Sequence, residues 1–247
     1  RRAAAEAAEE AGDGAQAEAW RREADGLMRC VNRSLQAACV RLGRDAMPAS
    51  PTRRLDAGAI GSLAAGYPLQ LVPPDDSRLA GTVEFLLQRC FVQGGFFQTM
   101  SHAGINQYLT LHVAQVLLRA GDARCLALTQ RMADLASPTG QWPEAIHPRT
   151  GGGCMGDGQH VWAAAEWVLM LRNAFVREEG DRLVLASGLP PAWWDQPLRF
   201  GPTLTRHGPV TVEIEPAGAE GMRVRWSGQW RAQPPAVEVR LLGHGCA

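Results

Sequence analysis

Apolar residues recur at three- and four-residue steps along the first three quarters of the chain, and this spacing is typical of helices. The helices predicted are Gln16–Leu42, Leu55–Ala65, Ser77–Cys90, Ile105–Ala120, Asp122–Leu135 and His160–Phe175. Two kinds of helix alternate, since the first of each pair has a charged face and the second is apolar on nearly every side. An apolar helix must be surrounded by protein, whereas a half-polar helix can border water. We therefore expect two layers, with amphipathic helices outside and apolar helices inside.

The connections between these helices are unequal in length. The turn from an inner helix to the next outer helix is tight, as at Gly121-Asp122. The outer-to-inner connections are long and polar, and comprise Arg44–Arg54, Phe91–Gly104 and Ser137–Gln159. Long irregular connections in a compact domain are usually functional. The layered arrangement predicts that all three open at the same end.

After Arg177 the hydrophobic pattern changes to a period of two, which indicates short strands. The predicted strands are Arg182–Ala186, Leu198–Thr205, Val210–Glu215, Met222–Trp226 and Val237–Leu242. Glycine- and proline-containing turns separate them. The pattern thus predicts a helical-hairpin domain over residues 1–178 and a small antiparallel β appendage over 179–247.

Composition places the chain among globular proteins and excludes several functions. Of its 247 residues 46% are hydrophobic and 20% charged, and the formal net charge is zero. A neutral chain lacks the excess of positive charge that attracts nucleic acid or an anionic membrane surface. No apolar run is long enough to span a bilayer. All 25 basic residues are Arg, which excludes lysine-based Schiff-base or P-loop chemistry. We predict no cofactor.

The six cysteines are scattered without a CxxC motif, which favours a reducing compartment and hence the cytoplasm. One of them could join a zinc site made of His147, Cys154, Asp157 and His160, but this spacing fits no standard finger, and we predict no metal. The first residue is not Met, and Arg1–Ala8 already follows a helical pattern. We expect the chain to be the C-terminal part of a longer protein.

The connection before the last helix carries the strongest candidate chemistry. Glu144 lies between Trp142 and His147, on a turn set by Pro143 and Pro148, and a glycine-rich loop follows. Glycines let the backbone approach a ligand, and Trp offers a flat surface for a sugar ring. A carboxylate in such surroundings suits general acid/base work on a glycosidic bond. The alternative is an ordinary connection with a solvated Glu.

Three residues near the start of that helix are further candidates. Asp157, between glycines, could bind sugar hydroxyls or could cap the helix, a role for which Asp is a preferred residue. His160 and Trp162 stand at the rim, where at least one should face the cavity. For Trp162, a place in the core is the alternative.

The other long connections add four more candidates. His102, Asn106 and Tyr108 follow the run Gly94–Gln98, and a polar cluster beside aromatic residues suits carbohydrate. Arg54, together with Arg53 and Asp56 in the first connection, could form an ion pair or could bind a substrate hydroxyl or phosphate group.

The segment Trp142–Gly151, followed by Trp162–Trp167, resembles the last hairpin of bacterial glucoamylase-type glycoside hydrolases. That family has a Pro-Glu pair, a Pro-x-Thr-Gly turn and a Trp early in the closing helix. Leu55–Ala57 with Val72–Leu79, and Ala11–Asp13 with Ala19–Asp25, are similar to earlier hairpins. The resemblance covers about residues 1–195.

This resemblance implies a mainly α fold: half of a six-hairpin α/α toroid, with the rest of the toroid as partner, followed by the β region. It implies that Glu144 is the general base of an inverting hydrolysis, with the general acid upstream of Arg1. The chain departs from the family at Ala145, where Gln is common, and at Gly152–Gln159, which replaces a shorter approach to the Trp.

The function predicted is therefore hydrolysis of glycosidic bonds, with a carbohydrate substrate and Glu144 as base. One alternative is a disaccharide phosphorylase, in which phosphate replaces water and Arg53, Arg54, Arg149 and the glycine-rich loop hold the anion. Another is a non-catalytic carbohydrate-binding or scaffold domain.

Overall fold

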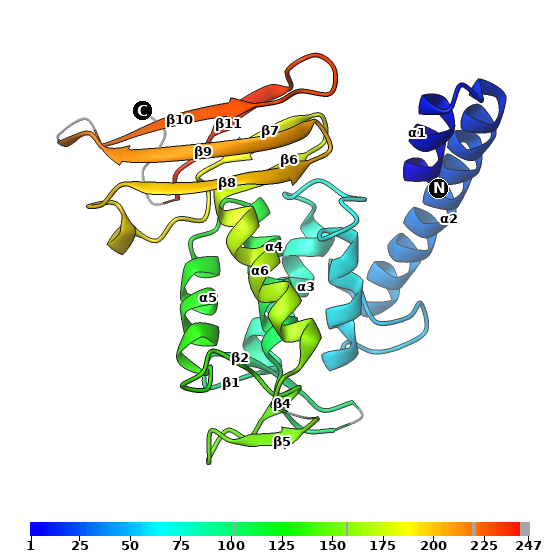
Figure 1. Ribbon diagram of the computed structural model, residues 1–247. Coiled ribbons are helices and arrows are strands. Elements are labelled where there is room, and N and C mark those ends of the chain that lie inside the picture. The colour runs from blue at the N-terminus through cyan, green and yellow to red at the C-terminus, as the bar shows by residue number, and fades with distance from the viewer. Residues whose placement is uncertain (101, 157, 219–220, 243–247) are drawn as a thin grey trace.

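The computed structural model describes residues 1–100, 102–156, 158–218 and 221–242 (Figure 1). Its α-helices are α1 (Arg2–Glu10), α2 (Gly14–Leu42), α3 (Ser77–Arg89), α4 (Gln107–Arg119), α5 (Arg124–Asp134) and α6 (Val161–Phe175). The 3-10 helices are η1 (Ala57–Ala65) and η2 (Pro191–Trp193). The helices from α2 onward agree with the predicted positions, except that Leu55–Ala65 forms the tighter η1. No helix among the described residues is both long and apolar enough to cross a membrane.

Helix α4 occupies the centre of the helical part. It packs against α5 and α6, while α3 packs against η1. Leu111, Val113 and Leu118 of α4 are fully buried, as the apolar pattern predicts for an inner helix. The α1–α2 hairpin leans away from the other helices at one edge of the molecule (Figure 1).

Helix α6, the other long helix predicted as inner, is open along one face. Val161, Trp162, Val168 and Leu169 are between 44% and 74% exposed, although the helix is apolar on nearly every side. The expectation that protein surrounds this helix is thus wrong for the described part of the chain.

A five-stranded antiparallel sheet is built from the long connections between the helices, in the order β1-β2-β3-β4-β5. Its strands are β1 (Phe91–Val92), β2 (Gly95–Gln98), β3 (Gly104–Ile105), β4 (Ala145–Ile146) and β5 (Gly153–Met155). The pairing of Ile105 with Ile146 joins the second and third long connections at one end of the helices. Asp56, next to the first connection, lines a pocket of about 250 Å³ together with Val92, Phe97 and Thr99 of the second.

Two three-stranded sheets follow the helices, at the end opposite the five-stranded sheet (Figure 1). They are built from β6 (Val176–Glu179), β7 (Arg182–Leu185), β8 (Leu198–Thr205), β9 (Gly208–Pro216), β10 (Met222–Gly228) and β11 (Ala236–Val239). One sheet has the order β10-β9-β8 and the other β11-β7-β6, and β11 runs parallel to β7. A second hydrophobic core that includes Val176, Leu185, Val212 and Ile214 joins the two sheets. The division into domains 1–178 and 179–247 stays a prediction.

The expected fold class, a mainly α incomplete toroid with strands only after about Arg182, is wrong. The chain combines helices with three β-sheets, and one sheet lies between the helices in sequence. The physical reason is that the long connections contain aromatic and β-branched residues, such as Phe96 and Ile105, which favour strands. The runs are two to four residues long, too short to show a period of two.

The start of α3 provides a test of local stability. Asp76 accepts hydrogen bonds from the backbone N–H groups of Arg78 and Leu79 and from the Arg78 guanidinium. The Arg78 side chain is the main cause that holds the pKa of Asp76 below its ordinary 3.8. We expect Asp76→Ala to lower the free energy of unfolding by about 1–2 kcal/mol at neutral pH, the usual effect of losing such a cap.

A group with a lowered pKa stabilises the fold above its unfolded-state pKa, and that contribution is lost as the pH falls through the folded-state value. The difference between wild type and Asp76→Ala in urea unfolding should therefore persist to pH 5 and shrink below 3.8. Asp76→Asn, which keeps an acceptor, is the control. A difference that does not change with pH would contradict a role for the ionised carboxylate.

Candidate functional site

The backbone around Glu144 is fixed by contacts with the start of α4. Asn106 is fully buried, and its amide Nδ2 donates a 3.0 Å hydrogen bond to the Glu144 carbonyl oxygen. Its Oδ1 accepts the backbone N–H of Leu109 at 3.0 Å and so caps α4. One side chain therefore ties the predicted catalytic turn to the inner helix. Asn106 positions Glu144 and, being buried, does not itself line an open site.

The Glu144 carboxylate faces a histidine from the second long connection. Its Oε1 lies 3.7 Å from Nε2 of His102, and the two side chains are 30% and 9% exposed. The carboxylate is thus open to solvent on one side and covered by an imidazole on the other. This arrangement suits a proton acceptor that must contact a substrate or water.

Three aromatic rings gather at the adjoining ends of α4 and α6. The Tyr108 ring stacks on His160 at 5.6 Å and meets the Trp162 ring edge-on, also at 5.6 Å. Trp162 is 65% exposed, so its face is free to contact a ligand. Burial first, and then the negative charge of Glu144, raise the pKa of Tyr108. The charge of Glu144 therefore acts on Tyr108 of this cluster.

Gly156 packs directly behind the Glu144 side chain. Its φ is +69°, and a Cβ atom added there would lie 2.9 Å from the Cβ of Glu144 and 3.3 Å from its Oε2. The glycine-rich loop thus approaches the carboxylate more closely than any other residue type would allow. Glycine permits a close backbone approach here, and the group that it approaches is the Glu144 side chain.

We expect Gly156→Ala to displace the Glu144 side chain and so to lower the rate of the glycoside hydrolysis that the sequence predicts. The left-handed φ adds strain of about 1–3 kcal/mol for a non-glycine residue. Gly151→Ala is the matched control, because Gly151 has a φ of +68° and no atom within 4 Å of an added Cβ. Urea unfolding should show the strain of the left-handed backbone in both variants and a further loss in Gly156→Ala from the contact with Glu144. Only Gly156→Ala should reduce kcat for the glycoside that the sequence predicts as substrate. Equal activities would show that the contact with Glu144 does not matter.

Other predicted site residues add no open aromatic face to this cluster, although the Trp142 carbonyl oxygen accepts the backbone N–H of His160 at 2.9 Å. Trp142 is 4% exposed, donates its indole N–H to the Met132 carbonyl at 2.7 Å and packs on Trp167, so it offers no open face to a sugar. His147 is exposed, and its Nδ1 accepts two backbone N–H groups of its own turn. Arg54 is exposed in the first connection. Asp157 lies outside the described residues.

The components proposed for a zinc site are separate in the described residues. No group of three or more His, Cys, Asp or Glu side chains in that part of the chain could hold a metal ion. The Cys154 thiol donates instead to the carbonyl oxygens of Ala103 and Ala145, at 3.4 and 3.6 Å.

The sequence analysis missed a polar network between α4 and α6. His112 Nε2 lies 3.4 Å from the buried carboxylate of Glu166, which also accepts a hydrogen bond from Gln115 at 3.2 Å. Asn173 donates to Gln115 at 3.1 Å. On α4 these groups continue a row of polar residues four, three and four positions apart: Tyr108, His112, Gln115 and Arg119. That spacing on an otherwise apolar helix is the signal that could have revealed the network.

The sequence matches no protein-family model and no curated protein. About half of the chain, 49%, is similar in fold to solved structures described as "Glycosidase Wild Type" and as an alanine variant of that glycosidase "in complex with glucose". The sequence identity is 23% and the TM-score 0.41 for each. The match spans 36% of the length of those glycosidases.

Proposed function

We propose that this protein takes part in the hydrolysis of a glycosidic bond, with Glu144 as the general base. The observation that carries the proposal is the Glu144 carboxylate, partly open to solvent and 3.7 Å from His102. Its charge acts on Tyr108, whose ring contacts those of His160 and Trp162. A base of this kind removes a proton from the water that attacks the anomeric carbon. The likeness of the Trp142–Gly151 segment to glucoamylase-type hydrolases adds support and favours inversion.

Each neighbour has a role in this proposal. His102 positions the carboxylate, and the exposed ring of Trp162 offers the apolar surface on which a sugar ring packs. Asn106 and Gly156 hold the turn in place from behind. We therefore assign the flat surface on which the sugar packs to Trp162, in place of Trp142, for which the sequence suggested this role.

The phosphorylase alternative requires cations near Glu144 to hold phosphate. The Arg53 guanidinium is instead 2.8 Å from Asp56, in an ion pair of the first connection. This pair supports the hypothesis that Arg53 forms an ion pair, and not the hypothesis that it binds phosphate. Hydrolysis is the function we retain.

The test is turnover of a panel of α- and β-glycosides by the full-length protein, with and without inorganic phosphate. We expect free sugar to be released at a rate that does not depend on phosphate, and anomeric inversion of the product by NMR. Turnover that requires phosphate and yields a sugar phosphate would replace hydrolysis by phosphorolysis. Binding of glycosides without turnover would favour a carbohydrate-binding domain.

A further inference from the structure

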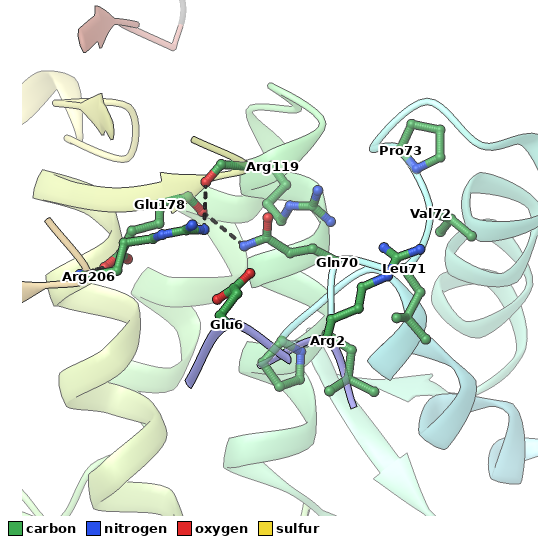
Figure 2. A pocket seen from close by; sticks show the side chains of 12 residues that line it. Arg2, Glu6, Gln70, Leu71, Val72, Pro73, Arg119, Glu178 and Arg206 are labelled. Atoms are coloured by element: carbon green, nitrogen blue, oxygen red, sulfur yellow. Dashed lines mark hydrogen bonds between the residues drawn. The ribbon is translucent and has the colours of Figure 1, made fainter. Parts of the chain in front are cut away.

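A cavity lies near the end of α4 that is far from Glu144. It has a volume of about 440 Å³ and lies between α1, the segment 68–73, the end of α4 and the turns at Gly180 and Arg206 (Figure 2). Tyr108 and Arg119 are 11 positions apart on α4, which corresponds to about 16 Å along a helix. The cavity is therefore separate from the proposed hydrolytic site.

Arg119 is a buried cation that the described part of the chain leaves without a carboxylate. It is 7% exposed, one guanidinium nitrogen donates to the Gly66 carbonyl oxygen, and its Nε has no hydrogen-bond partner there. No Asp or Glu oxygen of the described residues lies within ion-pair distance of it. The charge of Glu179 acts on Arg119 from farther away, but Glu179 is paired with Arg177 at 2.9 Å and lies 3.7 Å from Arg240. Buried charges are normally paired, and burial lowers the pKa of Arg119.

Two further arginines reach the same cavity from distant parts of the sequence. Arg2 comes from α1, and Arg206 comes from the turn between β8 and β9, where it donates to the Gly180 carbonyl oxygen at 3.1 Å. Figure 2 shows both on the rim around Gln70 and Arg119. Each has a solvent-exposed ion-pair partner, Asp25 at 3.8 Å from Arg2 and Asp181 at 3.4 Å from Arg206. Exposed pairs of this kind contribute little in water, so both guanidinium groups can also contact a ligand in the cavity.

The acidic residues of the cavity do not balance these cations. Glu178 is already engaged by Arg172, with oxygen–nitrogen distances of 2.6 and 3.0 Å. Glu6 of α1 is the remaining carboxylate among the lining residues. Among the lining residues there are thus three Arg and two Glu, and one of the two carboxylates is already bound to Arg172.

We propose that this cavity binds the oxyanion group, phosphate or carboxylate, of a small metabolite, with Arg119 as the central contact and Arg2 and Arg206 beside it. A guanidinium presents paired N–H donors that match such a group. The volume is that of a typical small-molecule site. The ligand would be distinct from the glycoside bound near Glu144.

The test is calorimetric titration of the full chain with inorganic phosphate and, in a second arm, with malonate, at constant ionic strength. We expect millimolar affinity for at least one of them, and the stronger of the two identifies the class of oxyanion. Arg119→Met, which keeps the apolar stem, should weaken binding by about tenfold or more, as expected for a lost hydrogen bond to a charged group.

Arg206→Gln provides a second variant, because Arg206 is exposed and its loss should not disturb folding. It should weaken binding by several-fold, whereas Arg223→Gln on β10 should leave binding unchanged. Absence of binding of both anions to wild type would overturn the proposal. Equal affinities for wild type, Arg119→Met and Arg206→Gln would also overturn it. Glycoside turnover, measured separately, tests the hydrolytic site alone.

Discussion

Glu144→Gln in the full-length protein should lower kcat for glycoside hydrolysis by about a hundred- to ten-thousand-fold, the usual effect of removing a general base. Gln keeps the shape and hydrogen-bonding reach of Glu but cannot accept the proton of the attacking water. Substrate affinity should change little, because the amide can keep the contacts of the carboxylate. Steady-state kinetics on the best glycoside of the panel give both values.

Glu213→Gln is the control for this variant. Glu213 is a carboxylate on β9 that pairs with Arg199 at 3.3 Å and lies far from α4 along the chain. Its replacement should leave kcat unchanged, and both variants should keep the wild-type unfolding midpoint. Unchanged hydrolysis by Glu144→Gln would reject Glu144 as the base, and turnover that depends on added phosphate would favour the phosphorylase.

The helices and the C-terminal strands could be predicted because each has its own hydrophobic period. Ser77–Cys90 shows a 3.6-residue pattern and forms α3 over Ser77–Arg89, and Leu198–Thr205 alternates and forms β8 over the same residues. Local patterns of this kind specify an element whatever it packs against. The five-stranded sheet has no such pattern, since β3 and β4 have two residues each and depend on the pairing of Ile105 with Ile146, 41 positions away.

The candidate site was only partly predictable for the same reason. The chemistry of Glu144 and its turn is local, and the structure brings His102, Tyr108 and His160 near it. The direction in which each Trp points is set by distant contacts. Trp142 turns toward Met132 and Trp167 in the core, while Trp162 points outward from α6. No spacing in the sequence distinguishes these two cases.

Trp142→Ala and Trp162→Ala should therefore change different properties: the first should lower stability, and the second should weaken substrate binding. Trp142 is buried and donates a hydrogen bond to Met132, and its truncation should lower the free energy of unfolding by about 3–5 kcal/mol, as for other large core residues. Trp142→Phe, which keeps most of the apolar contact but not the N–H donor, should lose only a part of that. Urea unfolding measures both.

Trp162 is 65% exposed, and a substitution at an open surface position usually changes stability by less than about 0.5 kcal/mol. Loss of its ring should instead raise KM for the glycoside, because the sugar loses the flat surface on which it packs, while kcat stays close to the wild-type value. Unfolding and steady-state kinetics of the two alanine variants together separate the roles. The assignment would be contradicted if KM rose in the Trp142→Phe variant and did not change in Trp162→Ala. In that case Trp142, and not Trp162, would be the residue on which the sugar packs.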